Sequence, residues 1–157
     1  MVTSYDRFLR ELAKERRVRV RVAGLCVDRE RLLVQQAADE PTGVMALPGG
    51  GLQLGASLEQ QLAQEFAEET TAQLRSARYL FVVEHTFRTV DGELVHSLEH
   101  YFAVELDRSE VRSKESHLIF SWVPIEDLSA TDLRPRVVRD TITSGDIATT
   151  KHLVEMA

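Results

Sequence analysis

Hydrophobic and polar positions in the first forty residues predict one helix followed by two strands. Between Ser4 and Arg16, apolar residues recur on one side of a helix and charged residues occupy the other side. From Arg17 to Val22 the pattern changes to strict alternation of arginine and valine, which is the period of a strand. The apolar stretch Ala23 to Val27 continues this strand toward the core, and Arg31 to Gln36 returns as its hairpin partner after a polar turn. The arginines of the alternating row are Arg17, Arg19 and Arg21.

The remaining patterns predict a mixture of strands and helices without an internal repeat or a linker. Ala37 to Thr42 reads as a polar loop, and Asp91-Gly92 is a strong signal for a hairpin turn between two strands. In chain order, the other expected elements are a short strand Val44 to Leu47, a helix Leu58 to Thr70, strands Leu80 to Val90, Leu94 to Leu106 and Leu118 to Val123, a helical turn Ile125 to Leu128, and a helix Leu133 to Ile142. We therefore expect one mixed domain over residues 1–157, with an N-terminal helix in 1–16 and a C-terminal helix and tail in 131–157.

Composition narrows the class of protein without naming a function. The 157 residues suit a single domain, and 43% apolar and 28% charged residues are an ordinary globular balance. A net charge of −6 argues against binding to a nucleic-acid polymer, because such proteins usually carry a basic surface. The sequence has no signal peptide and no apolar run long enough to span a bilayer, so we expect a cytoplasmic protein without membrane contact.

A glycine-rich segment precedes the central helix. Four of the eight glycines fall between positions 49 and 55, where a flexible backbone can approach a ligand closely. Ser57 and Gln60 form a capping box, which fixes the helix start directly after this segment. The stretch Gly50 to Ser57 superficially matches a P-loop. Ala56 stands where the phosphate-binding lysine would be, so we reject a P-loop here.

The central helix carries three glutamates on one face. Glu65, Glu68 and Glu69 are spaced i, i+3 and i+4, and no lysine or arginine lies between Gln53 and Leu74 to offset their repulsion. A solvated acidic face is the common alternative for such a cluster. A hard cation such as Mg²⁺ or Mn²⁺ would instead neutralise it, because these ions prefer carboxylate oxygens and phosphates. Together with the glycine segment, the cluster indicates a site for a divalent metal and a phosphate.

Residues 47–72 resemble the signature of the Nudix hydrolases. Leu47-Pro48-Gly49-Gly50-Gly51 is similar to the usual lead-in, with Gly50 at the opening glycine. Glu65-Phe66-Ala67-Glu68-Glu69 matches the helical core of the signature. Support comes from Arg31 to Gln35 before this box and from Trp122 to Leu128 after it, so that the resemblance covers roughly residues 17 to 130.

The resemblance implies a fold and an activity. The fold would be the Nudix α/β/α sandwich, a mixed sheet between helices. The activity would be hydrolysis of the pyrophosphate bond of a nucleoside diphosphate linked to another moiety, with Mg²⁺ or Mn²⁺ and a nucleotide-type small molecule as substrate. Family members also often form homodimers, which makes a homodimer an expectation here.

The resemblance also assigns roles to individual residues. It makes Glu65, Glu68 and Glu69 the catalytic metal ligands, with the backbone carbonyl of Gly49 as a further candidate ligand, and it makes Gly50 and Gly51 part of the substrate loop. Family members often place a base in the loop before the late tryptophan-containing strand, where Glu115 lies; Glu84 is a second candidate. From residue chemistry, Arg21 offers a guanidinium to a phosphate, although an alternating row is more often the wet face of a strand.

Three departures from the signature keep an alternative open. Ala56 stands where the family has a glutamate, Gln64 where it has an arginine, and Thr71 where a glycine closes the helix. The first two changes remove one charge of each sign, and the three main metal ligands of the family remain. Metal binding is therefore expected to survive, with hydrolysis slow or redirected. The alternative function is a catalytically impaired Nudix-fold domain that binds nucleotides or regulates.

Other possible sites rest on weaker signals. His96-Ser97-Leu98-Glu99-His100 matches an inverted zinc-peptidase pattern, but that chemistry needs a helix, and the surrounding alternation favours a strand. Phe87 and Tyr79 are candidates for stacking on a base, with core packing as the commoner fate.

Overall fold

The computed structural model describes residues 2–39 and 43–157. Residues 40–42 of the expected polar loop therefore lie outside the described residues. The helices are α1 (Ser4–Lys14), α2 (Leu58–Glu69), the short 3-10 helix η1 (Ile125–Ala130) and α3 (Arg136–Ser144). The strands are β1 (Val18–Leu25), β2 (Val27–Asp28), β3 (Arg31–Ala37), β4 (Val44–Met45), β5 (Gly49–Gly51), β6 (Leu74–Arg88), β7 (Leu94–Leu106), β8 (Leu118–Pro124), β9 (Asp132–Leu133) and β10 (His152–Glu155).

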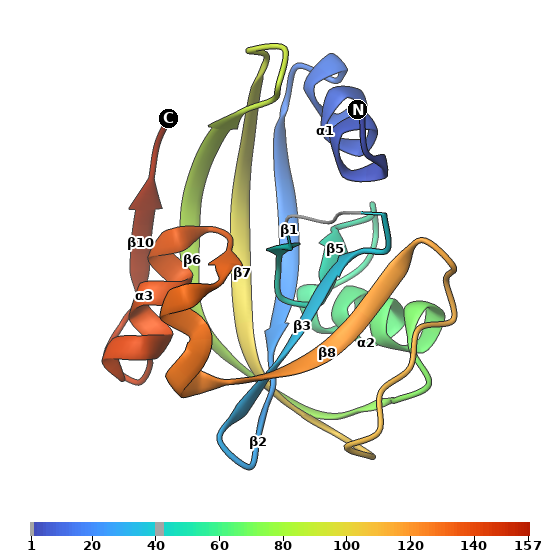
Figure 1. The fold of residues 1–157 in the computed structure, drawn as a ribbon, viewed down its shortest axis with the longest axis vertical. Coiled ribbons are helices and arrows are strands. Elements are labelled where there is room, and N and C mark those ends of the chain that lie inside the picture. Colours follow the sequence, from blue (N-terminus) through green and yellow to red (C-terminus); the bar gives the residue numbers. More distant parts are fainter. Residues whose placement is uncertain (1, 40–42) are drawn as a thin grey trace.

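The largest sheet is mixed and has the strand order β10-β6-β7-β1-β5 (Figure 1). Strands β1 and β7 are parallel, as are β10 and β6, whereas the pairs β6–β7 and β1–β5 are antiparallel. A smaller antiparallel sheet has the order β2-β3-β8, and β4 and β9 form a two-stranded parallel pair. The expected hairpin is thus formed only by β2 and β3, because β1 pairs in the other sheet.

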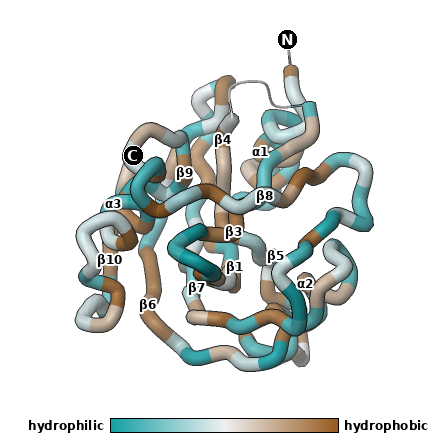
Figure 2. The backbone as a smooth tube through the Cα atoms, turned by 60° about the horizontal axis from the view of Figure 1, so that its bottom comes forward, coloured by the Kyte–Doolittle hydropathy of each residue, from teal (hydrophilic) through white to brown (hydrophobic). Residues whose placement is uncertain are grey.

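Helices cover both faces of the five-stranded sheet, because each face presents its own set of apolar side chains. Leu62 and Phe66 of α2 pack with Val22, Phe102 and Val104 on one face. On the other face a second core joins β1, β6 and β7 to β3, η1 and α3; its helical members are Leu128, Val138 and Ile142. In Figure 2, β6 is hydrophobic where it passes between β10 and β7. The expected α/β/α sandwich around a mixed sheet is confirmed.

Helix α1 begins at a capping box and lies against one end of the sheet, next to β1 (Figure 1). Thr3 accepts from the backbone N–H of Asp6, whose carboxylate accepts from Thr3 in return. The helix buries Leu9 and Ala13. Two polar links hold its exposed side: Ser4 donates to Asp39, and Arg10 Nη2 donates to Asp91 Oδ1 at 3.2 Å.

Several boundaries differ from the pattern-based expectation, and each difference comes from pairing or a cap. β6 begins at Leu74 because it pairs with β7 along nearly the full length of that strand, with register shifts near Ser76 and Phe81. The tail forms β10 because its backbone pairs with β6. Helix α3 begins at Arg136, since Leu133 belongs to β9 and Pro135 occupies the N-cap.

Within the described residues, no helix has the length and apolar character needed to cross a bilayer.

Candidate active site

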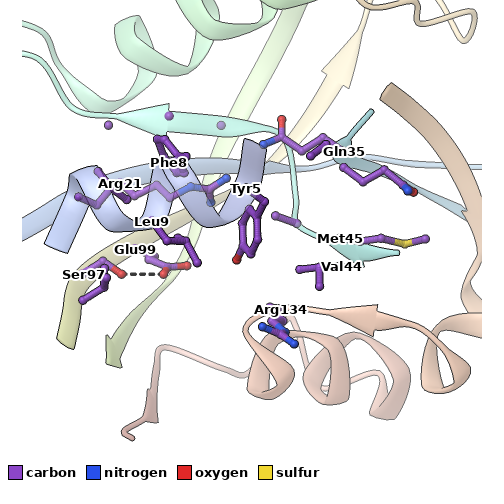
Figure 3. A pocket seen from close by; sticks show the side chains of 18 of the residues that line it. Tyr5, Phe8, Leu9, Arg21, Gln35, Val44, Met45, Ser97, Glu99 and Arg134 are labelled. Atoms are coloured by element: carbon purple, nitrogen blue, oxygen red, sulfur yellow. Dashed lines mark hydrogen bonds between the residues drawn. The ribbon is translucent and has the colours of Figure 1, made fainter. Parts of the chain in front are cut away.

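A cavity of about 410 Å³ lies between α1, the five-stranded sheet, the strands β3 and β4, and the glycine turn (Figure 3). Helix α1 forms one wall through Tyr5, Phe8, Leu9 and Leu12. The lining also includes Gly49–Gly51, which form β5. This volume is in the range that holds small-molecule ligands.

The register of three strands aligns polar side chains along the floor of the cavity. Alternate residues of a strand point to one face of a sheet, so paired residues share that face. Arg19 on β1 pairs with Ser97 on β7, which pairs in turn with His85 on β6. In the next row Arg21 pairs with Glu99. All five side chains line the cavity, so the row containing Arg19 and Arg21 is a cavity floor and not simply the wet face of a strand.

Glu99 is a buried carboxylate whose oxygens are fully engaged. Its Oε2 accepts from Ser97 Oγ at 2.7 Å and lies 2.8 Å from His85 Nδ1, while its Oε1 accepts from Tyr101 at 2.6 Å. Burial alone would raise the pKa of Glu99. The hydrogen bonds from His85 and Tyr101 and the charge of Arg21 outweigh burial and lower this pKa to about 2. The sheet thus fixes a negative charge beneath the cavity.

The glycine turn is shaped by two close approaches. A Cβ atom on Gly49 would lie 2.0 Å from the carbonyl oxygen of Val22, so only glycine allows β5 to pair with β1 here. A Cβ atom on Gly50 would lie 2.3 Å from the carboxyl carbon of Glu65. The missing side chain of Gly50 therefore leaves the space that the Glu65 carboxylate occupies.

Glu65 and Glu69 meet at the cavity beside this turn. Both line it, one helical turn apart on α2, and Gln61 Nε2 donates to Glu65 Oε1 at 2.9 Å. Burial and the neighbouring Glu65 carboxyl raise the pKa of Glu69 to about 7. Arg21 opposes this rise, and its Nη2 donates to the carbonyl of Leu47 at 2.7 Å, directly before the turn. Two carboxyl groups are held so close that protonation or a cation must relieve their repulsion.

Glu68 and Glu115 do not line the cavity. Glu68 is exposed and accepts from Gln64 Nε2 at 2.7 Å, because the two residues are neighbours on the outer side of α2. Glu115 is exposed in the segment between β7 and β8. That segment packs on the end of α2, since the N–H of Lys114 donates to the carbonyl of Glu69 at 2.8 Å. Glu115 is near enough that its charge also raises the pKa of Glu69.

The donor set suits a hard divalent cation in part. Glu65 and Glu69 supply carboxylate oxygens beside a glycine turn, which is the ligand type that Mg²⁺ and Mn²⁺ prefer. Their mutual repulsion is the feature that such an ion would remove. Among residues 2–39 and 43–157, no group of three or more histidine, cysteine, aspartate or glutamate side chains is arranged to hold a metal. The expected trio is therefore a pair here, and Glu68 would have to turn away from Gln64 to join it.

The remaining candidates divide between the two faces of the sheet. His96 and His100 lie on strand β7, as the alternation predicts, on the face opposite Ser97 and Glu99. His100 Nδ1 is 2.9 Å from the hydroxyl of Tyr79, and neither residue lines the cavity. Glu84 pairs with His152 at 2.6 Å, away from the cavity. Phe87 does line the cavity.

Several cavity residues carried no sequence signal for a place in the site. Tyr5, Gln35 and Arg134 come from three distant parts of the chain and meet only in the fold. Ser97 and Glu99 had a signal: both are polar, and they alternate along β7 with the same period as the buried Val95 and Tyr101.

Comparisons with known proteins agree with this fold. The family model described as NUDIX domain matches residues 15–141. No curated protein sequence matches the chain.

Solved structures of similar fold come from several bacteria. A mutator MutT protein from Bacillus halodurans is 17% identical with a TM-score of 0.65, over 88% of each chain. A MutT NUDIX hydrolase from Burkholderia pseudomallei is 24% identical with a TM-score of 0.59, over 70% of this chain and 85% of that one. The NUDIX domain of Shewanella oneidensis NrtR, crystallised with ADP ribose, is 19% identical with a TM-score of 0.64, over 83% of this chain and 88% of that one. At these identities the structural likeness establishes the fold, and the family model, which spans most of the chain, establishes membership: this protein belongs to the Nudix domain family.

Proposed function

We propose that this protein is a metal-dependent hydrolase that cleaves the pyrophosphate bond of a nucleoside diphosphate linked to another moiety. The observation that carries the proposal is the close pair of carboxyl groups, Glu65 and Glu69, on the cavity wall beside Gly50. Repulsion in such a pair favours a bound cation, and a glycine turn permits close approach of a phosphate.

Charge on the cavity floor supports a polyanionic substrate. Arg19 and Arg21 line the cavity, and no ion pair among the described residues involves either guanidinium. Guanidinium groups are well suited to phosphate oxygens because they donate two parallel hydrogen bonds. That a domain of similar fold was crystallised with ADP ribose supports the same class of ligand.

In the proposed reaction a water oxygen attacks one phosphorus and the bridging P–O bond breaks. A nucleoside monophosphate and a second phosphorylated product leave, and the proton of the water passes to a carboxylate. When bound, Mg²⁺ or Mn²⁺ would stabilise the charge on the phosphoryl oxygens and lower the pKa of the attacking water. Glu65 and Glu69 would hold the ion, Gly49 to Gly51 would shape the loop, with a carbonyl of Gly49 as a further ligand, and Arg21 would orient a phosphate. Glu115 is the candidate base: its charge acts on Glu69, but it is exposed outside the cavity, so its segment would have to bring it to the attacking water.

A catalytically impaired nucleotide-binding domain is the second candidate, favoured by Ala56 and Gln64. One contact bears on this candidate: Gln64 donates to Glu68 at 2.7 Å and so holds this carboxylate on the outer side of α2, away from Glu65 and Glu69. The double substitution Ala56→Glu with Gln64→Arg separates the two functions. A large gain from negligible activity favours impairment, and robust activity of the parent eliminates it.

The first experiment is turnover of a panel of nucleoside diphosphate derivatives with Mg²⁺ or Mn²⁺ added. We expect Glu65→Gln to lower kcat/KM by roughly 100-fold or more, because a metal ligand supplies several kcal/mol in the transition state. Glu59→Gln is the matched control, since Glu59 is exposed on the same helix and lies away from the cavity, and it should retain full activity. Absence of turnover on every panel member, combined with equal Mn²⁺ affinity of the parent and Glu65→Gln, would refute the proposal.

A further inference from the structure

Helix α1 lies outside the region that the family model matches, yet it builds part of the cavity. The match begins at residue 15, and α1 spans Ser4–Lys14. Its Tyr5, Phe8 and Leu9 side chains line the cavity (Figure 3). The Tyr5 side chain is half-buried, and this burial raises the pKa of its hydroxyl. A helix from outside the matched residues therefore supplies an aromatic and aliphatic wall at the place where a ligand would lie.

One polar atom at this end of the cavity lacks a partner. Gln35, on β3, lines the cavity, and its Oε1 is buried without a hydrogen bond to any atom of residues 2–39 and 43–157. A buried acceptor left unpaired costs about 1–3 kcal/mol, so a ligand N–H that reaches it is favoured strongly. A half-turn of the terminal amide exchanges its oxygen and nitrogen, and the group can therefore match an edge that carries a donor beside an acceptor.

The charges at this end are already neutralised, unlike those near the glycine turn. Arg134 lines the cavity, but its Nε and Nη2 donate to the two oxygens of Asp132 at 3.0 and 2.9 Å. Apolar side chains of β4, Val44 and Met45, also line the cavity here, together with the polar Gln36 and His117. An uncharged, flat group with a polar edge fits such surroundings better than a phosphate does.

We propose that α1 and Gln35 form a compartment for the nucleobase of the substrate. In this arrangement the Tyr5 ring and the apolar side of α1 cover a planar heteroaromatic ring, and the Gln35 amide binds the N–H edge of that ring. The proposal rests on the proposed function for the position of the phosphates, which would lie at the glycine turn. It assigns recognition of the base to a helix that precedes the matched domain.

The test measures binding separately from turnover. Calorimetry with AMP, GMP, CMP and UMP reports on a phosphate with a base, and ribose 5-phosphate reports on a phosphate without one. We expect Gln35→Leu to weaken binding of at least one nucleotide by about three- to tenfold, the worth of one hydrogen bond. We expect Tyr5→Leu to weaken all of them by at least about fivefold, since an aromatic cover contributes about 1–3 kcal/mol per base. Binding of ribose 5-phosphate should stay unchanged in both variants.

Matched controls use the same residue types outside the cavity. Gln73→Leu and Tyr79→Leu alter an exposed glutamine and an exposed tyrosine that do not line it, and both should bind like the parent. Should Gln35→Leu fail to fold, Gln35→Asn withdraws the amide by one methylene and should show the same selective loss.

The outcomes separate this inference from the proposed function. Turnover in the parent together with unchanged nucleotide binding in the Gln35 and Tyr5 variants overturns the compartment and leaves the hydrolase standing. Nucleotide binding that depends on Gln35 and Tyr5, in a parent without turnover, supports the compartment and refutes the hydrolase. A parent that binds none of the four nucleotides overturns the compartment.

Discussion

The two faces of the five-stranded sheet are built from the same strands, and they serve different purposes. On the α2 face, Val22 and Phe102 are buried against Phe66, and a Cβ atom added to Gly24 would lie only 3.1 Å from the Phe66 ring. On the cavity face, one residue away along the same strands, Arg21 and Glu99 stand side by side. One face is closely packed around Gly24, whereas the other holds a charged floor beneath a cavity.

This contrast shows what an alternating pattern of residues in a sequence can predict about the two faces of a strand. Alternation of arginine and valine correctly predicted that β1 has two unlike faces. It could not decide whether the arginines face solvent or a cavity, because that depends on what other elements place above them. Here α1, β3 and the glycine turn enclose the arginine face, so residues that look like surface become the floor of a site.

The largest expected effect is on the packed face. Phe66→Ala should lower the free energy of unfolding by about 3–5 kcal/mol, because the side chain is fully buried and the tight surroundings cannot collapse into the space. Urea denaturation measures this loss. Ile119→Ala, which removes a side chain that is 45% exposed, is the control and should cost far less. Equal losses in the two variants would show that the α2 face is not the tightly packed one.

A smaller effect is expected on the charged floor, and it depends on pH. Glu99→Gln leaves at least one donor among Ser97, His85 and Tyr101 without an acceptor, at a cost of about 1–3 kcal/mol at neutral pH. Because the folded-state pKa of Glu99 is lowered from 4.5 to about 2, its ionised form stabilises the native state above pH 4.5. That contribution is lost as the pH falls from 4.5 through about 2.

Acid titration of stability tests this second prediction. The parent should lose more stability than Glu99→Gln over that acid range, so the difference between them should shrink as the pH falls. Glu105→Gln, an exposed change on the same strand, should follow the parent curve closely. Parallel curves for the parent and Glu99→Gln would contradict the lowered pKa.

The smallest effect on stability is expected at the glycine turn, where function should respond instead. The methyl group of Gly50→Ala would meet the end of the flexible Glu65 side chain, which can rotate away. Unfolding free energy should change by less than about 1 kcal/mol, while Mn²⁺ affinity should fall by about tenfold as the carboxylate leaves its position. Gly49→Ala is the contrasting variant: its methyl group meets the backbone of Val22 and should disrupt the pairing of β5 with β1. A Gly50→Ala protein that unfolds as readily as Gly49→Ala would show that the turn is purely structural.

Local signals in the sequence predicted those elements whose determinants are local. The capping box of Ser57 and Gln60 is present at the start of α2, and Gly92 adopts a positive φ of 83° between β6 and β7. Strand β5 was missed because Gly49–Gly51 has no side chains from which a period could be read. Strand β10 was missed because it exists through pairing with β6, a segment about seventy residues earlier.

The site divides in the same way. The glycine turn could be predicted from its run of glycines, and the pair Glu65 and Glu69 from their spacing on one helix. The outward direction of Glu68 could not, because it depends on whether Gln64 or a ligand holds that side chain. A binding role for Tyr5 and Gln35 could not be predicted either, since Tyr5 belongs to no motif, Gln35 counted only as part of the stretch before the box, and the two meet only when α1 folds over the sheet.

The turn between β6 and β7 helps to hold α1, and through α1 it supports one wall of the cavity. Arg10 ties the outer side of α1 to Asp91 at the tip of that turn, more than eighty residues away in the chain, through an ion pair in which both side chains are partly exposed. Such pairs contribute at most about 1 kcal/mol and weaken with salt. Higher ionic strength should therefore weaken slightly the attachment of α1, which forms one wall of the cavity. This effect is independent of any effect of salt on the phosphates of a ligand.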